Sequence, residues 1–454
     1  MNRDIYKNLM QWKAESNRRP LLIRGARQVG KTYLVRYFGK EEFEDYIELN
    51  FEKNPEYKDI FTSIDPLEIV EKITLFTQIK VTTGKTLLFL DEVQDCPAAI
   101  TSLRYFFEEM PELHIIAAGS LVEFTINSEK FRMPVGRIQY LYMFPLSFGE
   151  FLDAIGEKAL RNHILNKDGL QKLPESLHLR LLDYIRKFFY LGGMPAVLQE
   201  YCLSRNIEKC QRIQRSIVDT YIDDFGKYAK TVKHKYLRKV FYAVPRMVGQ
   251  KFVYTNVDNT IKSRELKEAV ELLEMAGVIF RIKSTSGAGI PLEAGAKENY
   301  FKPLFLDVGL MHAMNNIYGE TARAEDFSSI FKGAVAEQFV GQQLLAYQSP
   351  YTKPSLYYWT RDARNSKAEI DYLMVKDEKI IPVEVKSGAI GHMKSMHIFI
   401  NTFNSDSGLR ISQAKYDIDF QNRIHSIAFY GIEGIINGDL MQLYSEYENR
   451  EKQY

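Results

Sequence analysis

The feature that most constrains this chain is an apolar run that turns into a glycine-containing loop, residues 21–35, "LLIRGARQVGKTYLV". The run before the loop is apolar enough for a buried strand, and the residues after it have helical apolar spacing. Between them the spacing G-x-x-x-x-G-K-T extends from Gly25 to Thr32. Glycines allow the backbone to curl so that N–H groups point at an anion, and the helix N-terminus adds its dipole. The stretch therefore predicts a phosphate-binding loop between a strand and a helix.

A second motif supports this interpretation over a chance match in a glycine turn. "KTLLFLDEVQD" places four apolar residues directly before Asp91 and Glu92. A buried parallel strand would carry both acids at its carboxyl end, where α/β sheets bind ligands. We expect Thr32 and Asp91 to hold Mg²⁺, Lys31 to reach the β- and γ-phosphates, and Glu92 to orient or deprotonate the attacking water. The predicted nucleotide contacts are Gly25, Ala26, Arg27, Gln28, Val29, Gly30, Lys31, Thr32 and Tyr33.

Three polar residues extend the predicted site. Ser120 ends the apolar run "LHIIAAGS" and is either a polar sensor beside the γ-phosphate or the N-cap of the next helix. Arg137 follows a glycine turn before an apolar stretch and is either an arginine finger acting between subunits or a surface arginine. Arg27, inside the loop, either contacts phosphate or is solvated.

The motifs "GARQVGKT", "LLFLDEVQ", "AAGS" and "VGRIQYLYMFPLSFGEFL" together resemble an AAA+-type ATPase family of bacteria and archaea, related to the archaeal ATPases. The resemblance implies a five-stranded α/β ATPase core that uses ATP rather than GTP. It also implies that a helical lid follows the core, and that a winged-helix module follows the lid. The turn "GGMP" in "YLGGMPAVLQEY" matches the same family.

The middle of the chain is strongly basic. Residues 205–251 contain twelve Lys or Arg against four Asp or Glu, although the whole chain carries a net charge of only +2. A basic helical surface with tyrosines suits a phosphate backbone, which makes DNA a candidate partner. The alternatives are a solvated helix face or a contact with an acidic neighbouring domain.

The last third of the chain carries a carboxylate pattern. Asp371 ends "EID", and Glu384 and Lys386 share one face of the strand "IPVEVKSG". Glu337 lies in the preceding amphipathic helix and could add a ligand. Such a set could bind Mg²⁺ and steady an attacking water, and it resembles the PD-(D/E)xK nuclease superfamily. It is also similar to the domain of unknown function that usually follows this ATPase family. A bare E-x-K is usually a surface ion pair, so the sequence leaves cleavage open.

Composition sets the remaining expectations. Three cysteines without metal-ligand spacing, no apolar signal segment and no long apolar run favour a cytoplasmic protein that does not enter a membrane. We predict an α/β chain in four parts: a P-loop ATPase core (1–160), a helical lid (161–230), a winged-helix-like module (231–300) and a nuclease-like domain (301–454). The predicted function is an ATP- and Mg²⁺-using ATPase coupled to a DNA-facing nuclease-like domain. The alternative is a nucleotide-switched platform for DNA or protein without cleavage, and the finger would require a homo-oligomer.

Overall fold

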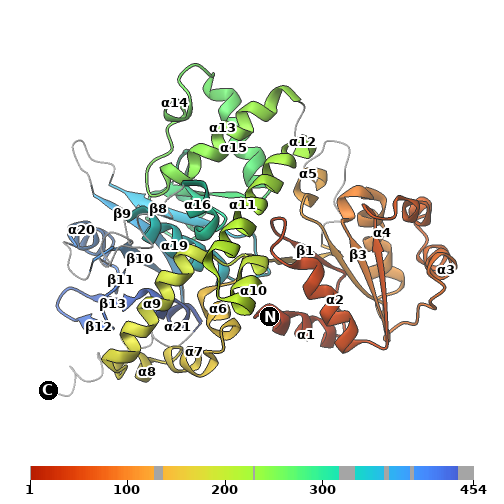
Figure 1. Cartoon of the computed structure of the whole chain (residues 1–454), viewed down its shortest axis with the longest axis horizontal. Helices are drawn as coiled ribbons and strands as arrows, with labels where there is room; N and C mark the ends of the chain where they lie inside the picture. Colours follow the sequence, from red (N-terminus) through yellow and green to blue (C-terminus); the bar gives the residue numbers. More distant parts are fainter. Residues whose placement is uncertain are drawn as a thin grey trace.

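The computed structural model describes residues 2–126, 136–228, 231–315, 333–361, 368–388 and 393–437. Figure 1 shows two sheets at opposite ends of the molecule, with helices between and above them. Among the described residues, no helix combines the length and the apolar character needed to cross a bilayer.

The N-terminal sheet is parallel throughout and has the order β2-β3-β4-β1-β5. Its strands are β1 (Leu21–Arg24), β2 (Asp45–Asn50), β3 (Thr86–Asp91), β4 (His114–Ala118) and β5 (Gln139–Tyr142). The helices of this part are α1 (Tyr6–Ala14), α2 (Lys31–Glu42), α3 (Pro66–Thr77), α4 (Pro97–Glu109) and α5 (Val122–Ile126), with 3₁₀ turns at Pro55–Thr62 and Val93–Asp95. Leu87 and Phe89 of β3 join one apolar cluster, whereas Leu88 and Leu90 join another. Both faces of the sheet are therefore buried, which explains the continuous apolar run in the sequence.

Helices occupy the middle of the chain. They are α6 (Phe148–Ala154), α7 (Lys158–Ile164), α8 (Lys167–Gln171), α9 (Glu175–Leu191), α10 (Pro195–Ser204), α11 (Ile207–Asp223), α12 (Phe225–Tyr228), α13 (Thr231–Met247), α14 (Tyr254–Val257) and α15 (Ser263–Met275). Helix α6 begins with a capping box in which Ser147 and Glu150 satisfy each other's backbone N–H groups. The turn between α9 and α10 contains Gly192 at φ 69°, a left-handed conformation that favours glycine.

The C-terminal sheet has eight strands in the order β12-β13-β11-β10-β9-β8-β6-β7. They are β6 (Ile279–Thr285), β7 (Ala296–Phe305), β8 (Leu356–Thr360), β9 (Glu369–Lys376), β10 (Lys379–Val385), β11 (Gly408–Ser412), β12 (Asp417–Asp419) and β13 (Ile424–Ala428). The remaining helices are α16 (Val308–Asn315), α19 (Gly333–Ala346), α20 (Lys394–Phe403) and α21 (Ile432–Asn437), with 3₁₀ turns at Leu292–Gly295 and Phe429–Gly431.

The structure places the strand pair of the predicted winged-helix module in this C-terminal sheet. Strand β6 pairs antiparallel with β7 and parallel with β8. The boundary predicted between residues 300 and 301 falls inside β7, so it does not separate two sheets. The sequence pattern of a strand shows that it pairs but not with which partner, because pairing depends on segments far away in the chain.

Two buried polar groups join the parts. The carboxylate of Asp307 is fully buried and accepts hydrogen bonds from the backbone N–H groups of Gly193 (2.6 Å) and Leu310 (3.0 Å) and from Nε2 of Gln342 (3.0 Å). Arg161 of α7 pairs with Asp4, Asp153 and Glu433, which come from three separate segments. One apolar cluster likewise runs from β1 through the helices to α21. The helical middle and the C-terminal sheet are therefore packed as one body.

Candidate functional site

The predicted phosphate-binding loop connects β1 to α2. Gly25 has φ 145°, and a Cβ there would lie 2.2 Å from the carbonyl oxygen of Met143, so no larger residue fits. Gly30, at φ 99°, is the N-cap of α2 and offers no capping side chain to the first turn of that helix. The free N–H groups of this turn and the helix dipole form a cradle for an anion. Val29 is buried and Tyr33 is exposed, both beside this turn.

Lys31 points into its own loop. Its side chain is buried, and Nζ donates to the carbonyl oxygens of Gly25 and Ala26, both at 2.8 Å. Burial lowers the pKa of Lys31 to about 8, and the nearby carboxylates of Glu92 and Asp91 only partly offset this effect. The ammonium thus has only neutral carbonyl partners and would gain from a phosphate at the loop.

The Thr32 hydroxyl meets the carboxylate of Asp91 at the carboxyl end of β3. Oγ1 of Thr32 lies 3.1 and 3.3 Å from the two Asp91 carboxylate oxygens, and Nδ2 of Asn50 donates to Oδ2 of Asp91 at 2.9 Å. Burial and the charge of Glu92 raise the pKa of Asp91 to about 6. The hydrogen bonds from Thr32 and Asn50 lower this pKa, but by less than the other two effects raise it. A hydroxyl and a carboxylate are oxygen ligands that Mg²⁺ prefers, so the residues fit the metal. Sequence analysis missed Asn50, although a polar residue at the end of a neighbouring parallel strand was a usable signal.

Glu92 follows Asp91 in a left-handed conformation, φ 50°. Its Oε2 accepts a hydrogen bond of 2.7 Å from Nε2 of Gln94. Gln94 in turn packs against Gly119, where a Cβ would lie 2.0 Å from Oε1 of Gln94. The backbone turn and Gln94 therefore fix the Glu92 carboxylate next to the end of β4. Sequence analysis gave Gln94 no role.

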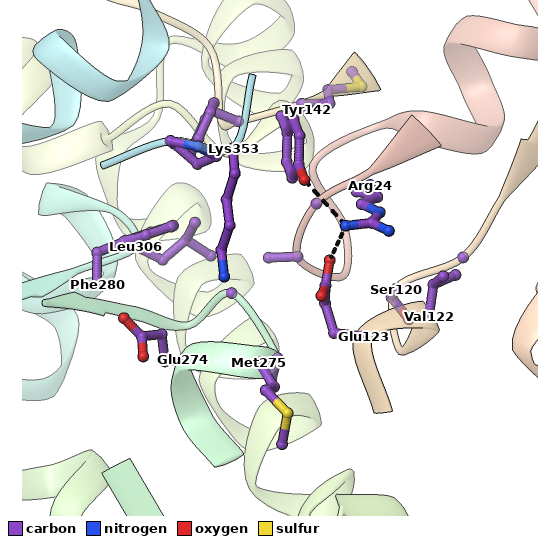
Figure 2. Close-up of a pocket in the computed structure, with 18 residues that line it drawn as sticks. Arg24, Ser120, Val122, Glu123, Tyr142, Glu274, Met275, Phe280, Leu306 and Lys353 are labelled. Atoms are coloured by element: carbon purple, nitrogen blue, oxygen red, sulfur yellow. Dashed lines mark hydrogen bonds and ion pairs between the residues drawn. The ribbon is translucent and has the colours of Figure 1, made fainter. Parts of the chain in front are cut away.

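Ser120 is buried, and its Oγ has no hydrogen-bond partner among the described residues. It lines a pocket together with Gly25 and Ala26 of the loop (Figure 2). At the rim of this pocket Arg24 donates to the Tyr142 hydroxyl (3.0 Å) and pairs with Glu123 (2.9 Å). Lys353 extends across the pocket, and in this view its amino group lies between Glu274 and Glu123 (Figure 2). The described part of the chain therefore places Ser120 beside the loop but shows no N-cap bond from its side chain.

The structure places Arg137 away from these groups. Its Nε donates to Oε1 of Glu108 on α4 at 2.8 Å, and the side chain is 43% exposed. Within one chain this is a surface ion pair. A role as a finger stays a prediction that requires a second copy of the chain.

Arg27 forms an ion pair with a residue far away in the chain, and its contact with phosphate stays a prediction. Its Nη1 donates to both carboxylate oxygens of Asp224, which follows α11, at 2.5 and 2.6 Å. Tyr221 of α11 donates through its hydroxyl to the Arg27 carbonyl oxygen at 2.7 Å. Gly277, which follows α15, packs closely against the same loop. A Cβ atom added at Gly277 would lie only 3.3 Å from the backbone nitrogen of Ala26. The helical middle of the chain thus contacts the loop at two points, which the sequence could not show.

The four predicted nuclease residues come together in the C-terminal sheet. Glu384 of β10 pairs with Lys386, Oε1 to Nζ at 2.5 Å, and Oδ2 of Asp371 on β9 accepts from the backbone N–H of Val385 at 2.8 Å. Glu337 of α19 is linked to Asp371 by Lys302. The Nζ atom of Lys302 lies 3.5 Å from the Glu337 carboxylate and 3.4 Å from the Asp371 carboxylate. Burial and the charge of Asp371 raise the pKa of Glu337 to about 8 and that of Glu384 to about 7.

Lys302 is the residue that sequence analysis missed here. Its side chain is 1% exposed and also pairs with Glu369 (2.5 Å). Burial lowers the pKa of Lys302, but Glu337, Asp371 and Glu369 outweigh burial and leave that pKa raised. In the described part of the chain, no group of three or more His, Cys, Asp or Glu is arranged to hold a metal ion. Lys302 already lies as a cation between Glu337, Glu369 and Asp371, so the predicted nuclease chemistry of Asp371 and Glu384 stays a prediction.

The loop, the acids facing it and the parallel sheet define a P-loop domain of the α/β class. Comparison with protein families agrees, because a family described as an AAA domain matches residues 17–152. The N-terminal part of the chain is therefore similar to an AAA domain over these residues. Two domains of unknown function match residues 182–321 and 332–430. Among curated proteins, no match was found.

Several solved structures are similar to this chain. The Walker-type ATPase of Pyrococcus abyssi is 16% identical, with a TM-score of 0.45, over 69% of this chain and 95% of that one. The Aeropyrum pernix Orc1 protein in complex with DNA is 12% identical, with a TM-score of 0.26, over 70% and 92%. The Thermotoga maritima RuvB Holliday junction branch migration motor is 15% identical, with a TM-score of 0.26, over 62% and 90%. At such low scores these likenesses carry no argument about function.

Proposed function

We propose that the chain is an ATPase that binds ATP with Mg²⁺ at the loop of residues 25–32. The observation that carries the proposal is the Thr32 hydroxyl held against the Asp91 carboxylate at 3.1 and 3.3 Å, next to an anion cradle. Asp91, with a pKa of about 6, is ionised near neutral pH and can accept a cation. ATP rather than GTP follows from the family resemblance.

Each residue then has a distinct role. Lys31 exchanges its two carbonyl partners for phosphate oxygens, and its ammonium needs no further desolvation because it is already buried. Thr32 and Asp91 hold Mg²⁺, which neutralises phosphate charge when bound. Glu92 accepts a proton from, or orients, the attacking water, and Gln94 keeps its carboxylate in place. Ser120 supplies a hydroxyl whose partner would be the γ-phosphate or that water.

The test is phosphate release from ATP with Mg²⁺. Glu92→Gln should slow release about 100-fold or more, the range for loss of a general base, with little change in ATP affinity. Lys31→Met should weaken ATP binding about 10-fold or more. The matched control is Asp95→Asn, an exposed acid in the same turn as Glu92, which should behave as the unaltered protein. Normal turnover in Glu92→Gln would contradict the assignment.

We further propose that the C-terminal part is a nucleotide-controlled binding platform rather than a nuclease. The Arg27–Asp224 pair and the contact of Gly277 with Ala26 support the control, because both lie on the loop itself. The ion pairs of Lys302 disfavour a metal-dependent nuclease domain, the other function suggested by Asp371 and Glu384.

DNA is the partner to test first. Arg215 on α11 and Arg238 on α13 are exposed and make no ion pair among the described residues, whereas Lys233 and Lys239 pair with acids. Retention of DNA should depend on ATP, and Arg215→Gln with Arg238→Gln should reduce the salt slope of binding by about 2. Arg104→Gln, an exposed residue of α4, is the control. An unchanged slope in the double variant would exclude this surface.

A further inference from the structure

The carboxylate cluster of the C-terminal sheet contains its own cation. Lys302 lies on β7, and its side chain crosses the neighbouring strands to acids of β9. With 1% of its side chain exposed, it is among the most buried charged groups of the described residues. A buried ammonium is stable only where carboxylates surround it, and here three do.

The ammonium of Lys302 lies at the centre of three carboxylates. Its Nζ lies 2.5 Å from Oε1 of Glu369, 3.4 Å from Oδ1 of Asp371 and 3.5 Å from Oε2 of Glu337. The ring of Tyr358 on β8 lies beneath the ammonium, with its centroid 5.4 Å from Nζ. The three acids come from α19 and from two positions on one face of β9, so Nζ is the point on which they converge.

A divalent ion held by Glu337, Glu369 and Asp371 would have to occupy the same point. Carboxylate ligands approach such ions to about 2.0–2.6 Å, well inside the distances that separate Lys302 from Asp371 and Glu337. The other oxygen of Asp371 already accepts the backbone N–H of Val385, and Oε1 of Glu384 pairs with Lys386. Oε2 of Glu384 is buried and has no hydrogen-bond partner among the described residues, but it lies on β10, outside the three acids that surround Lys302. An ion added beside Lys302 would face its positive charge within a few ångströms in a buried site.

We propose that Lys302 is the permanent cation of this cluster. It occupies the point on which Glu337, Glu369 and Asp371 converge, so the cluster binds no catalytic metal there and the domain cleaves no phosphodiester. Its acids instead fix β7 to α19 and β9. This matters for the rest of the molecule, because β7 pairs with β6, which follows the Gly277 contact with the loop.

The cluster also supports the segment that precedes this strand pair. Gly249, at φ 77° after α13, lies so close to Glu337 that a Cβ there would be 3.1 Å from both carboxylate oxygens. Lys302 therefore holds together the helical module, the helix α19 and the C-terminal sheet at one point. The arrangement is that of a joint between parts rather than that of an open site.

The experiment is a titration with Mn²⁺ in the absence of nucleotide, with free Mn²⁺ followed by electron paramagnetic resonance. The protein and its Asp371→Asn variant should bind the same number of ions, because any binding at Asp91 is common to both. Lys302→Met should gain one site with a dissociation constant of about 1 mM or tighter, the range of weak carboxylate sites. Adding Asp371→Asn to Lys302→Met should abolish the gained site.

The matched control is Lys283→Met. Lys283 on β6 also pairs with two acids, Glu293 and Glu298, but it lies nearer the surface at 20% exposure. This variant should gain no site. A Mn²⁺ site in the unaltered protein that Asp371→Asn removes would overturn the proposal, as would a folded Lys302→Met that gains none.

A plasmid cleavage assay tests the proposal without the Lys302→Met variant, so its result does not depend on whether that variant folds. The unaltered protein with Mn²⁺ should nick plasmid no faster than Glu384→Gln. Cleavage that this variant abolishes would overturn the proposal. Phosphate release from ATP, measured on the same samples, is independent of both outcomes and tests the loop separately.

Discussion

Replacing Arg161 by methionine removes the guanidinium that joins three distant segments of the chain. Nη1 of Arg161 donates to Asp153 at 2.6 Å and to Asp4 at 3.2 Å, while Nε donates to Oε2 of Glu433 at 3.1 Å. Nη2 makes further bonds to Asp4 and Glu433. The side chains of Arg161 and Glu433 are 7% and 8% exposed, whereas Asp4 is 42% exposed. Glu433 is therefore left as the most buried of these carboxylates when the arginine is lost, and Asp153, at 21% exposure, loses its partner as well.

The cost follows from that difference in exposure. Removing one partner of a buried ion pair destabilises a protein by about 3–5 kcal/mol, because the other charge stays buried. Asp4 regains water, so its loss contributes little. Burial already raises the pKa of Glu433, and its protonation in the variant limits the total cost to about 3 kcal/mol. The exposed pair of Arg180 with Glu157 is the control, and Arg180→Met should cost less than about 1 kcal/mol.

The assay is urea unfolding followed by tryptophan fluorescence. The two tryptophans are well placed, because Trp12 is buried beside the N-terminal sheet and Trp359 lies on β8. Adding Glu433→Leu to Arg161→Met should restore stability to within about 1 kcal/mol of the unaltered protein, since the charge of the most buried carboxylate, Glu433, is removed together with its partner. A double variant as unstable as the sum of the two single variants would refute the reasoning.

Three further predictions concern the turn, the core and the loop. Gly192→Ala should destabilise the protein by about 3 kcal/mol in urea unfolding, because φ is 69° and the new Cβ would lie 2.0 Å from Oδ1 of Asp307; a cost under about 1 kcal/mol would contradict this. Burial lowers the pKa of His312 to about 4, below the value of about 6.5 in the unfolded chain. The unfolded state thus binds more protons, so stability is full above about pH 6.5 and falls toward pH 4, by about 2 kcal/mol at about pH 5. His312→Leu should lose this part of the pH dependence, and an unchanged profile would exclude the site. Thr32→Val should weaken ATP binding about 10-fold or more with Mg²⁺ and little without it, as measured by calorimetry; an equal loss in both would argue against a metal ligand.

The parts of the fold that could be predicted from the sequence are those that depend on neighbouring residues. The loop at Gly25, the strand ending at Asp91 and the strand before Ser120 lie where the apolar runs and glycines place them. In a parallel sheet the carboxyl ends of strands meet at one edge, so Thr32 and Asp91 could be brought together from sequence alone. That inference needs no knowledge of the chain beyond the first sheet.

The partners of Arg27 and Lys302 could not be predicted in this way. Arg27 and Asp224 are 197 residues apart, and no local pattern marks either as half of an ion pair. Lys302 sits in "KENYFKPLF", where it reads as one of two lysines on a half-exposed strand. Its burial depends on how β7 pairs and on where α19 lies, which only the tertiary structure decides. The same dependence explains why the expected boundary at residue 300 falls within a strand.

The contacts also locate the place where a bound nucleotide can act on the rest of the chain. Asp307, Arg161 and Lys302 fix the helical middle to the C-terminal sheet through buried groups, and moving any of them would expose unpaired charges or hydrogen-bonding groups. The link between Arg27 and Asp224 differs, because Arg27 lies in the loop itself and its side chain is 20% exposed. A triphosphate brings negative charge that competes with Asp224 for the same guanidinium. If the proposed nucleotide binding releases Asp224, the end of α11 would be freed, and the buried joints would carry that displacement as a rigid movement to β7 and the C-terminal sheet.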